Sequence, residues 1–294
     1  MGFLIVANPG AGSTRDGEII VRARERLPDT RLLELAPGVD LAEAVSRAVS
    51  EGRVVVAAGG DGTVNSVVQH VAGRGEMGVL PVGTLNHFAR DLGLRDVDAA
   101  LDALERGEAR SIDVGVANGV YFVNHAGLGL YPEGVRERER SEGRRGRAAA
   151  SLGAATRMLR AARPLVGTIE ADGDRRALFA WVVFVGNNRF GTVPTGFGVR
   201  TRLDEGVLDV GVVTARPRAV SRARAAWRLA KGKAWRTRRL VRTEARHVVV
   251  HLEGPPRPVS LDGEQGEATD TLEVRLVPRG LSVRLPATAA IEVS

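Results

Sequence analysis

Two glycine-rich segments carry the residue types that bind phosphate groups. The first, Gly59-Gly60-Asp61-Gly62-Thr63, follows the apolar run Val54–Ala58, and the second, centred on Gly83, follows Val79–Val82. Both runs have the length and the β-branched content of buried strands. Glycine lets the backbone approach an oxyanion, and the helix that follows presents free N–H groups and its positive dipole end. Two such turns at neighbouring strand ends predict a phosphate pocket at the carboxyl edge of a parallel sheet.

The second glycine segment continues as Pro81-x-Gly83-Thr84-x-Asn86-x-Phe88-Ala89-Arg90. Together, the two segments resemble the diacylglycerol kinase-like lipid kinases. The shorter glycine–aspartate signature is shared more widely, by NAD kinases, sphingosine kinases and phosphofructokinases, and the second motif narrows the resemblance to the lipid kinases. The alternative is a pair of tight turns that bind no ligand.

The start of the chain resembles the opening motif of the same family, which contacts the nucleotide. A strand expected at Gly2 to Ala7 leads into Asn8-Pro9-Gly10-Ala11-Gly12, although a plain tight turn is the alternative. The resemblance and the phosphate cradle together imply one set of nucleotide-binding residues. This set is Asn8, Pro9, Gly10, Ala11, Gly12, Gly59, Gly60, Asp61, Gly62, Thr63, Val64, Asn65, Ser66, Gly83, Thr84 and Asn86.

Acidic residues are expected to supply the remaining chemistry of phosphoryl transfer. Asp61, between glycines, would reach a magnesium ion through water, or would instead hold its turn by accepting hydrogen bonds from backbone N–H groups. The segment Ser260–Glu264 resembles the family's aspartate–glycine–glutamate motif, which makes Glu264 the proton acceptor and lets Asp262 orient it or a metal-bound water. A base must lie within hydrogen-bond reach of the attacking hydroxyl. Read alone, Asp-Gly-Glu is a common hairpin turn.

The segment Arg202 to Asp209 resembles the family's acidic loop, where a carboxylate before a glycine binds a structural magnesium ion. The resemblance implies that Glu205 is the ligand, together with the backbone carbonyls of Arg202 and Val207. The family usually has aspartate at this position. Because glutamate reaches further, the metal would shift, bind through water or be absent. A simple turn with solvated acids is the alternative.

Two departures from the family pattern concern the acceptor side of the site. Ser66 stands where a glutamate is frequent, and His87 stands where an aspartate often follows the asparagine of the second motif. His87 would bind an anionic head group or be an ordinary helix-surface or packed histidine. His87, Arg90 and Asn187 are the weaker candidates for contact with substrate.

Two domains are needed to position these motifs. Strands and helices alternate as far as Leu94, which predicts a Rossmann-like parallel α/β domain over residues 1–110. Strands then dominate, which predicts an antiparallel β-sandwich over residues 111–282, with residues 283–294 returning to the first domain. The Asn118-Gly119 turn predicts a hairpin between strands at 111–116 and 119–125.

Composition bears on the partners. The chain of 294 residues has a net charge of +7 and no cysteine, which excludes disulfides and thiolate metal sites and favours acidic partners such as nucleotides or an anionic membrane. Aromatic residues are only 4%, so we expect no nucleic acid partner. The segment 216–242 has no acidic residue and would form either a membrane-surface helix or a helix covering a sandwich edge.

The sequence therefore predicts an ATP- and Mg²⁺-dependent lipid kinase that phosphorylates the hydroxyl of diacylglycerol or a related lipid. We expect a cytoplasmic protein that contacts the inner membrane face transiently, because no apolar run has the length of a membrane span. A homodimer is compatible with the sequence. The alternatives are an NAD kinase-like nucleotide kinase and a non-catalytic nucleotide-binding protein.

Overall fold

The computed structural model describes residues 1–8, 14–83, 86–129, 163–193, 196–200, 202–215 and 240–287. Several predicted features lie outside these residues. They are residues 9–13 of the opening motif, Thr84 of the second glycine motif, residues 216–239 of the arginine-rich segment, and residues 288–294 at the C-terminus.

The N-terminal part is a parallel sheet in the order β2-β1-β3-β4, as the alternation of strands and helices predicts. Its strands are β1 (Phe3–Ala7), β2 (Thr30–Glu34), β3 (Val54–Gly59) and β4 (Glu76–Pro81). Its helices are α1 (Thr14–Arg26), α2 (Leu41–Ser50), α3 (Asp61–Val71), α4 (His87–Asp91) and α5 (Val97–Arg106). No helix in the described part of the chain is long and apolar enough to span a bilayer.

The apolar pattern explains why these elements pack. All six residues of β3 are buried, as expected for a central strand covered on both faces. Val64, Val67, Val68 and Val71 of α3 recur at three- and four-residue spacing and lie in the same core. This packing fixes the start of α3 directly at the end of β3, where the first glycine segment lies.

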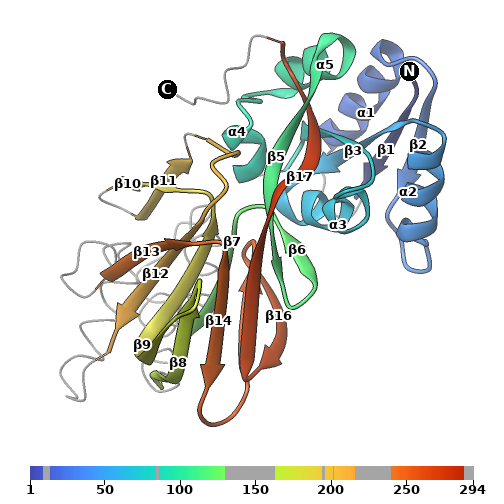
Figure 1. The fold of residues 1–294 in the computed structure, drawn as a ribbon. Coiled ribbons are helices and arrows are strands. Elements are labelled where there is room, and N and C mark those ends of the chain that lie inside the picture. Colours follow the sequence, from blue (N-terminus) through green and yellow to red (C-terminus); the bar gives the residue numbers. More distant parts are fainter. Residues whose placement is uncertain are drawn as a thin grey trace, which may run out of the picture.

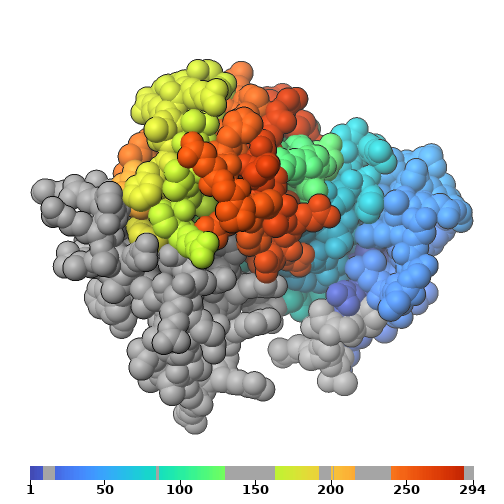
Figure 2. Space-filling view, turned by 90° about the horizontal axis from the view of Figure 1, so that it is seen from below, coloured from blue at the N-terminus to red at the C-terminus, as the bar shows by residue number. Residues whose placement is uncertain are grey.

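The rest of the described chain is built mainly of antiparallel strands around a second hydrophobic core. The strands are β5 (Glu108–Ala117), β6 (Val120–Phe122), β7 (His125–Gly129), β8 (Leu165–Ala171), β9 (Asp174–Asn187), β10 (Phe190–Val193), β11 (Gly196–Arg200), β12 (Leu208–Thr214), β13 (Leu240–Ala245), β14 (His247–Leu252), β15 (Arg257–Leu261), β16 (Glu264–Thr269) and β17 (Thr271–Leu285). Seen from below, the last strands adjoin the N-terminal part directly (Figure 2). The predicted fold class, a parallel α/β part followed by an antiparallel sandwich, is confirmed.

Strand β17 joins the two parts (Figure 1). Its first residues pair with β14, whereas Ser282 and Val283 pair in parallel with β4. Strand β5 pairs with β17 along both stretches, with one irregularity between Val277 and Leu281. Both strands therefore run through both parts, and the predicted domain boundary at residue 110 stays a prediction.

One predicted strand was wrong. The expected strand at 119–125 is two strands, β6 and β7, separated by a bend at Val123 and Asn124. The Asn118-Gly119 hairpin itself forms, with φ values of 47° and 85° that suit its tight turn. The strand breaks because the backbone N–H groups of residues 123–125 donate to the carboxylate of Asp262 rather than to a neighbouring strand.

Candidate functional site

The two glycine turns lie against each other. A Cβ atom built on Gly83 would lie 2.4 Å from the Cα atom of Gly60, so a side chain at Gly83 is excluded by backbone. The turns meet because β3 and β4 are neighbours, with Gly59 paired to Pro81. Helix α3 begins at Asp61, and the first N–H groups of a helix have no partner within it. The two turns therefore form a backbone surface with partial positive charge.

Asp61 connects the two turns. Its carboxylate accepts hydrogen bonds from the backbone N–H groups of His87 and Phe88, both at 3.1 Å, and so caps the start of α4. Asn86, with φ of 49°, donates from Nδ2 to the carbonyl of Gly83 at 2.7 Å. The turn-holding interpretation of Asp61 matches these contacts. Its role toward a metal stays a prediction.

The other predicted nucleotide-binding residues differ in their burial and contacts. Thr63 and Val64 are buried, and Thr63 packs on Gly59, where a Cβ would meet its Oγ1 at 2.2 Å. Asn65 accepts a hydrogen bond from Gln69, and Ser66 donates to the carbonyl of Gly62 at 3.0 Å. Asn8 lies exposed after β1.

Glu264 lies over this backbone surface. It is the first residue of β16, and a Cβ built on Gly62 would lie 2.7 Å from its Oε1 atom. The side chain is otherwise exposed. A carboxylate from the C-terminal strands therefore reaches the first turn of α3, and the absence of a side chain at Gly62 makes room for it.

Asp262 fixes the turn from which Glu264 projects. It has φ of 49°, and its carboxylate accepts hydrogen bonds from Val123, Asn124 and His125 at 2.8, 2.8 and 2.9 Å. Burial raises the pKa of Asp262 to about 6, although these three N–H donors act in the opposite direction. Asp262 thus positions Glu264 through the chain, not by direct contact.

Arg200 also binds the segment of residues 123–125 that Asp262 binds. This arginine was not identified from the sequence. Its side chain is fully buried, and it donates to Asp91 of α4, to the carbonyls of Val123 and Asn187, and to Oδ1 of Asn124. The bond from Nε to Asp91 Oδ2 is 2.8 Å long. The guanidinium therefore connects α4, next to the glycine turns, with the segment that Asp262 binds. The one feature of the sequence that could have drawn attention to Arg200 is its position two residues before the acidic loop.

The weaker substrate candidates differ in their surroundings. Asn187 is 1% exposed, and its Nδ2 donates to the carbonyls of Asp113 and Val123 at 2.8 and 3.1 Å, so its amide hydrogens are committed to the backbone. His87 and Arg90 are exposed on α4. Both lie at the surface beside the glycine turns.

His125 is a half-buried histidine beside this network. Its ring stacks on Phe184 with centroids 5.2 Å apart. Burial lowers the pKa of His125 to about 3, and the positive charge of Arg200 and the proximity of His87 add to the effect. The ring is therefore neutral at physiological pH and cannot serve there as a cationic phosphate ligand.

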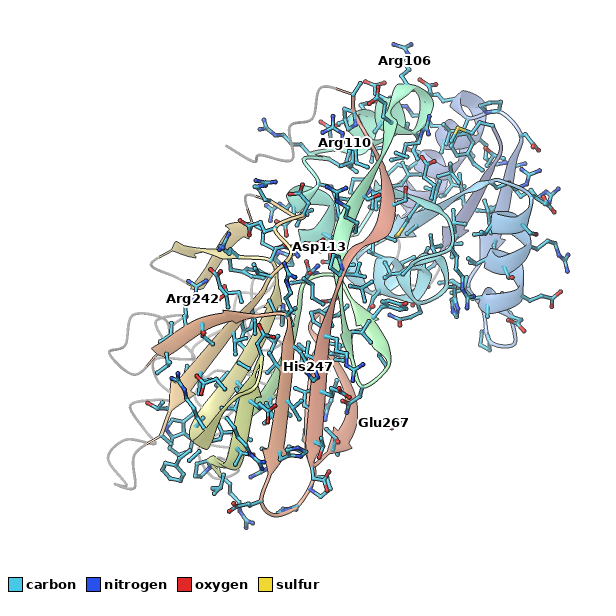
Figure 3. All side chains as sticks on the ribbon, in the orientation of Figure 1. Arg106, Arg110, Asp113, Arg242, His247 and Glu267 are labelled. Carbon is cyan, nitrogen blue, oxygen red and sulfur yellow. The ribbon has the colours of Figure 1, made fainter. Side chains whose placement is uncertain are left out.

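Two of the three expected magnesium ligands, Glu205 and the Val207 carbonyl, have protein hydrogen-bond partners, and their role toward a metal stays a prediction. Glu205 accepts hydrogen bonds from Arg189 on both oxygens, each at 2.9 Å, and the carbonyl of Val207 accepts from the N–H of Asn188. Within the described residues, no group of three or more histidine or acidic side chains could hold a metal ion. Asp113, on β5 between the two parts (Figure 3), accepts from the N–H of Gly206 at 2.7 Å. Glu205, Gly206 and Val207 of this loop are therefore all hydrogen-bonded to other protein groups.

Comparison with known proteins shows the family to which the chain belongs. Residues 2–117 match the diacylglycerol kinase catalytic domain, and residues 129–285 match the YegS C-terminal NAD kinase beta sandwich-like domain, which alone spans more than half of the chain. The chain belongs to the diacylglycerol kinase-like family. In this diacylglycerol kinase-like protein, the two glycine turns lie in the region that matches the catalytic domain, and most strands of the sandwich lie in the region that matches the second domain.

Individual relatives agree with this membership. A diacylglycerol kinase of Bacillus subtilis is 48% identical over 91 residues, which cover 29% of this chain and 30% of that protein. The chain thus matches less than a third of the length of this curated relative. A crystal structure of a proposed diacylglycerol kinase from Bacillus anthracis has a TM-score of 0.70 and 22% identity, with 98% of each chain covered. An NAD kinase from Archaeoglobus fulgidus in complex with ATP has a TM-score of 0.53 and 12% identity, covering 96% of this chain and 93% of that one. Both structures establish the fold alone.

Proposed function

We propose that the protein is a kinase that transfers the γ-phosphoryl group of ATP, bound as its Mg²⁺ complex, to the hydroxyl of diacylglycerol or a related lipid. The observation that carries this proposal is the position of Glu264 against Gly62, where an acidic side chain faces the glycine turns. The match to the diacylglycerol kinase catalytic domain and the B. subtilis relative support the reaction class.

The glycine turns would hold the triphosphate. The first-turn N–H groups of α3 and the backbone at Gly60 and Gly83 present donors without side chains in the way. Magnesium ions that accompany nucleotides bind mainly phosphate oxygens and water, with few protein ligands, and would neutralise charge on the transferred group. Asp61 contributes by holding α4 next to the turns.

Glu264 would act as the general base. It accepts the proton of the lipid hydroxyl, and the hydroxyl oxygen forms a bond to the γ-phosphorus while the bond to the β–γ bridging oxygen breaks, so that ADP leaves. A glutamate that is exposed apart from its contact with α3 is accessible to an acceptor arriving from outside. Asp262 and Arg200 keep the turn before Glu264 in place through residues 123–125.

The protein would bind its lipid acceptor at a membrane surface. The net charge of +7 favours contact with the anionic inner face, where diacylglycerol resides within the bilayer. We include in the proposal a cytoplasmic location with transient membrane contact.

The test compares Glu264→Gln with Glu267→Gln, a matched change at an exposed residue of the same strand (Figure 3). Labelled ATP is offered with diacylglycerol vesicles, a mixed lipid extract and NAD in separate reactions. We expect label on lipid with wild type and E267Q, at least a ~100-fold lower rate with E264Q, and nearly equal ATP affinity for all three. Label on NAD alone would replace the lipid kinase with a nucleotide kinase. Equal rates for E264Q and E267Q would remove Glu264 as the base.

A further inference from the structure

An arginine from outside the acidic loop, Arg189, lies against the loop as a counter-ion. Arg189 follows β9 and donates to Glu205 from its backbone N–H and from its guanidinium, each at 2.9 Å. The same guanidinium binds Glu244 of β13 through two bonds, Nε to Oε1 at 2.6 Å and Nη2 to Oε2 at 2.7 Å. One planar cation thus bridges the loop and the neighbouring strand. A guanidinium suits this task because it offers several donors in a fixed geometry.

The other acidic groups of the loop are paired in the same way. Asp209 forms an ion pair with Arg242, which lies on β13 two residues before Glu244 (Figure 3). Asp204 is paired with Arg202 at 3.0 Å. The carboxylates of Asp204, Glu205, Asp209 and Glu244 therefore each have an arginine partner that compensates their negative charge. Asp113, which also contacts the loop, accepts instead from the backbone N–H groups of Gly206 and Arg279.

The backbone of the loop is also held without a metal. The N–H of Glu205 donates to Oδ1 of Asn188 at 2.8 Å, and the N–H of Asn188 donates to the carbonyl of Val207 at 3.0 Å. Asn188 is fully buried and has φ of 64°, so this conformation is fixed by its surroundings. The Val207 carbonyl, which the family resemblance offers to magnesium, already accepts this hydrogen bond.

We propose that Arg189 replaces the structural magnesium ion in this protein, so that the acidic loop keeps its fold without a divalent cation. The glutamate at position 205 fits this role, because its additional methylene group, compared with aspartate, extends the carboxylate toward the guanidinium. This inference concerns the loop alone. It does not depend on which acceptor is phosphorylated, and it does not concern the magnesium ion that accompanies ATP.

Thermal unfolding without nucleotide tests the proposal. Wild type is unfolded in EDTA and in MgCl₂, with NaCl added to equal ionic strength. We expect the same Tm in both, and no stoichiometric magnesium in protein purified without chelator. A Tm that falls in EDTA and returns with MgCl₂, or one bound magnesium per chain, would overturn the replacement. These readouts involve no activity, so a failure here is distinct from a failure of the lipid kinase proposal.

The variant Arg189→Gln should lower Tm by several degrees, because Glu205 and Glu244 lose their common partner. MgCl₂ should then recover part of the loss, because freed carboxylates attract a divalent cation. The matched control is Arg176→Gln, an arginine exposed on β9 whose ion-pair partner, Asp174, is also exposed. Equal Tm values for the two variants would show that Arg189 does not hold the loop. If R189Q fails to fold, the chelation and metal measurements on wild type still decide.

Discussion

Replacing the buried Arg200 with methionine gives the most informative perturbation of the site. The guanidinium is fully buried and donates to four partner residues from three places in the chain, namely Asp91, Val123, Asn124 and Asn187. Methionine fills a similar volume but has no charge and no donor. Arg200→Met therefore leaves the Asp91 carboxylate, whose side chain is only 11% exposed, without its cation.

The expected loss follows from the physics of buried ion pairs. Removing one partner of a buried pair costs about 3–5 kcal/mol, because the remaining charge stays in a poorly solvated place. For a chain of this size each kcal/mol lowers Tm by about 2–4 °C, so R200M should unfold about 10 °C below wild type. The double variant D91N/R200M removes the stranded charge and should recover about 1 kcal/mol or more of the loss.

Urea or thermal unfolding of wild type, R200M and the double variant measures these differences. Arg176→Met is the control, since that arginine is exposed and should show no measurable change. At a temperature where R200M stays folded, we also expect lower turnover, because α4 and the segment before Glu264 lose their common anchor. The reasoning is refuted if R200M is as stable as R176M.

Three further predictions concern the glycine turns and His125. Gly83→Ala should destabilise the fold by about 1–3 kcal/mol, because the new Cβ would lie 2.4 Å from the Cα atom of Gly60. Gly60→Ala should fold normally, because its Cβ would lie 3.6 Å from the Cα atom of Gly83. Urea unfolding of the two variants measures the difference in stability. Gly62→Ala should leave stability nearly unchanged and lower turnover, because the new methyl group displaces the flexible end of Glu264; a kinase assay beside thermal unfolding checks this. His125, with a pKa lowered to about 3, contributes stability that is fully present above about pH 6.5 and is lost as pH falls toward 3, because only the unfolded chain takes up the proton. A phenylalanine at this position should flatten that acid slope in urea titrations at several pH values, and an unchanged slope would contradict it.

The sequence predicted the local features well because they depend on neighbours in the chain. Strand β3, the start of α3 and the Asn118-Gly119 turn each follow from residues within one short window. The proximity of Gly60 and Gly83 followed from a rule of parallel sheets rather than from contact information. These features position the backbone that we propose binds phosphate.

Contacts between distant residues could not be predicted. Arg200 meets Asp91 across more than a hundred residues, and nothing in either neighbourhood indicates the other. The bend between β6 and β7 depends on Asp262, which lies far downstream. Likewise, Glu205 was recognisable as a carboxylate before a glycine, whereas its partner Arg189 becomes visible only after β9 and β12 pair.

The shared strand β17 limits how the two parts can move. It pairs with β5 on both sides of an irregularity at residues 278–280, where Arg279 has φ of 52° and donates its N–H to Asp113 at 2.8 Å. Elsewhere along the strand, bending would break ladder hydrogen bonds. If the distance between Glu264 and the glycine turns changes by bending of β17, we expect the bend at residues 278–280, where Asp113 binds the N–H of Arg279.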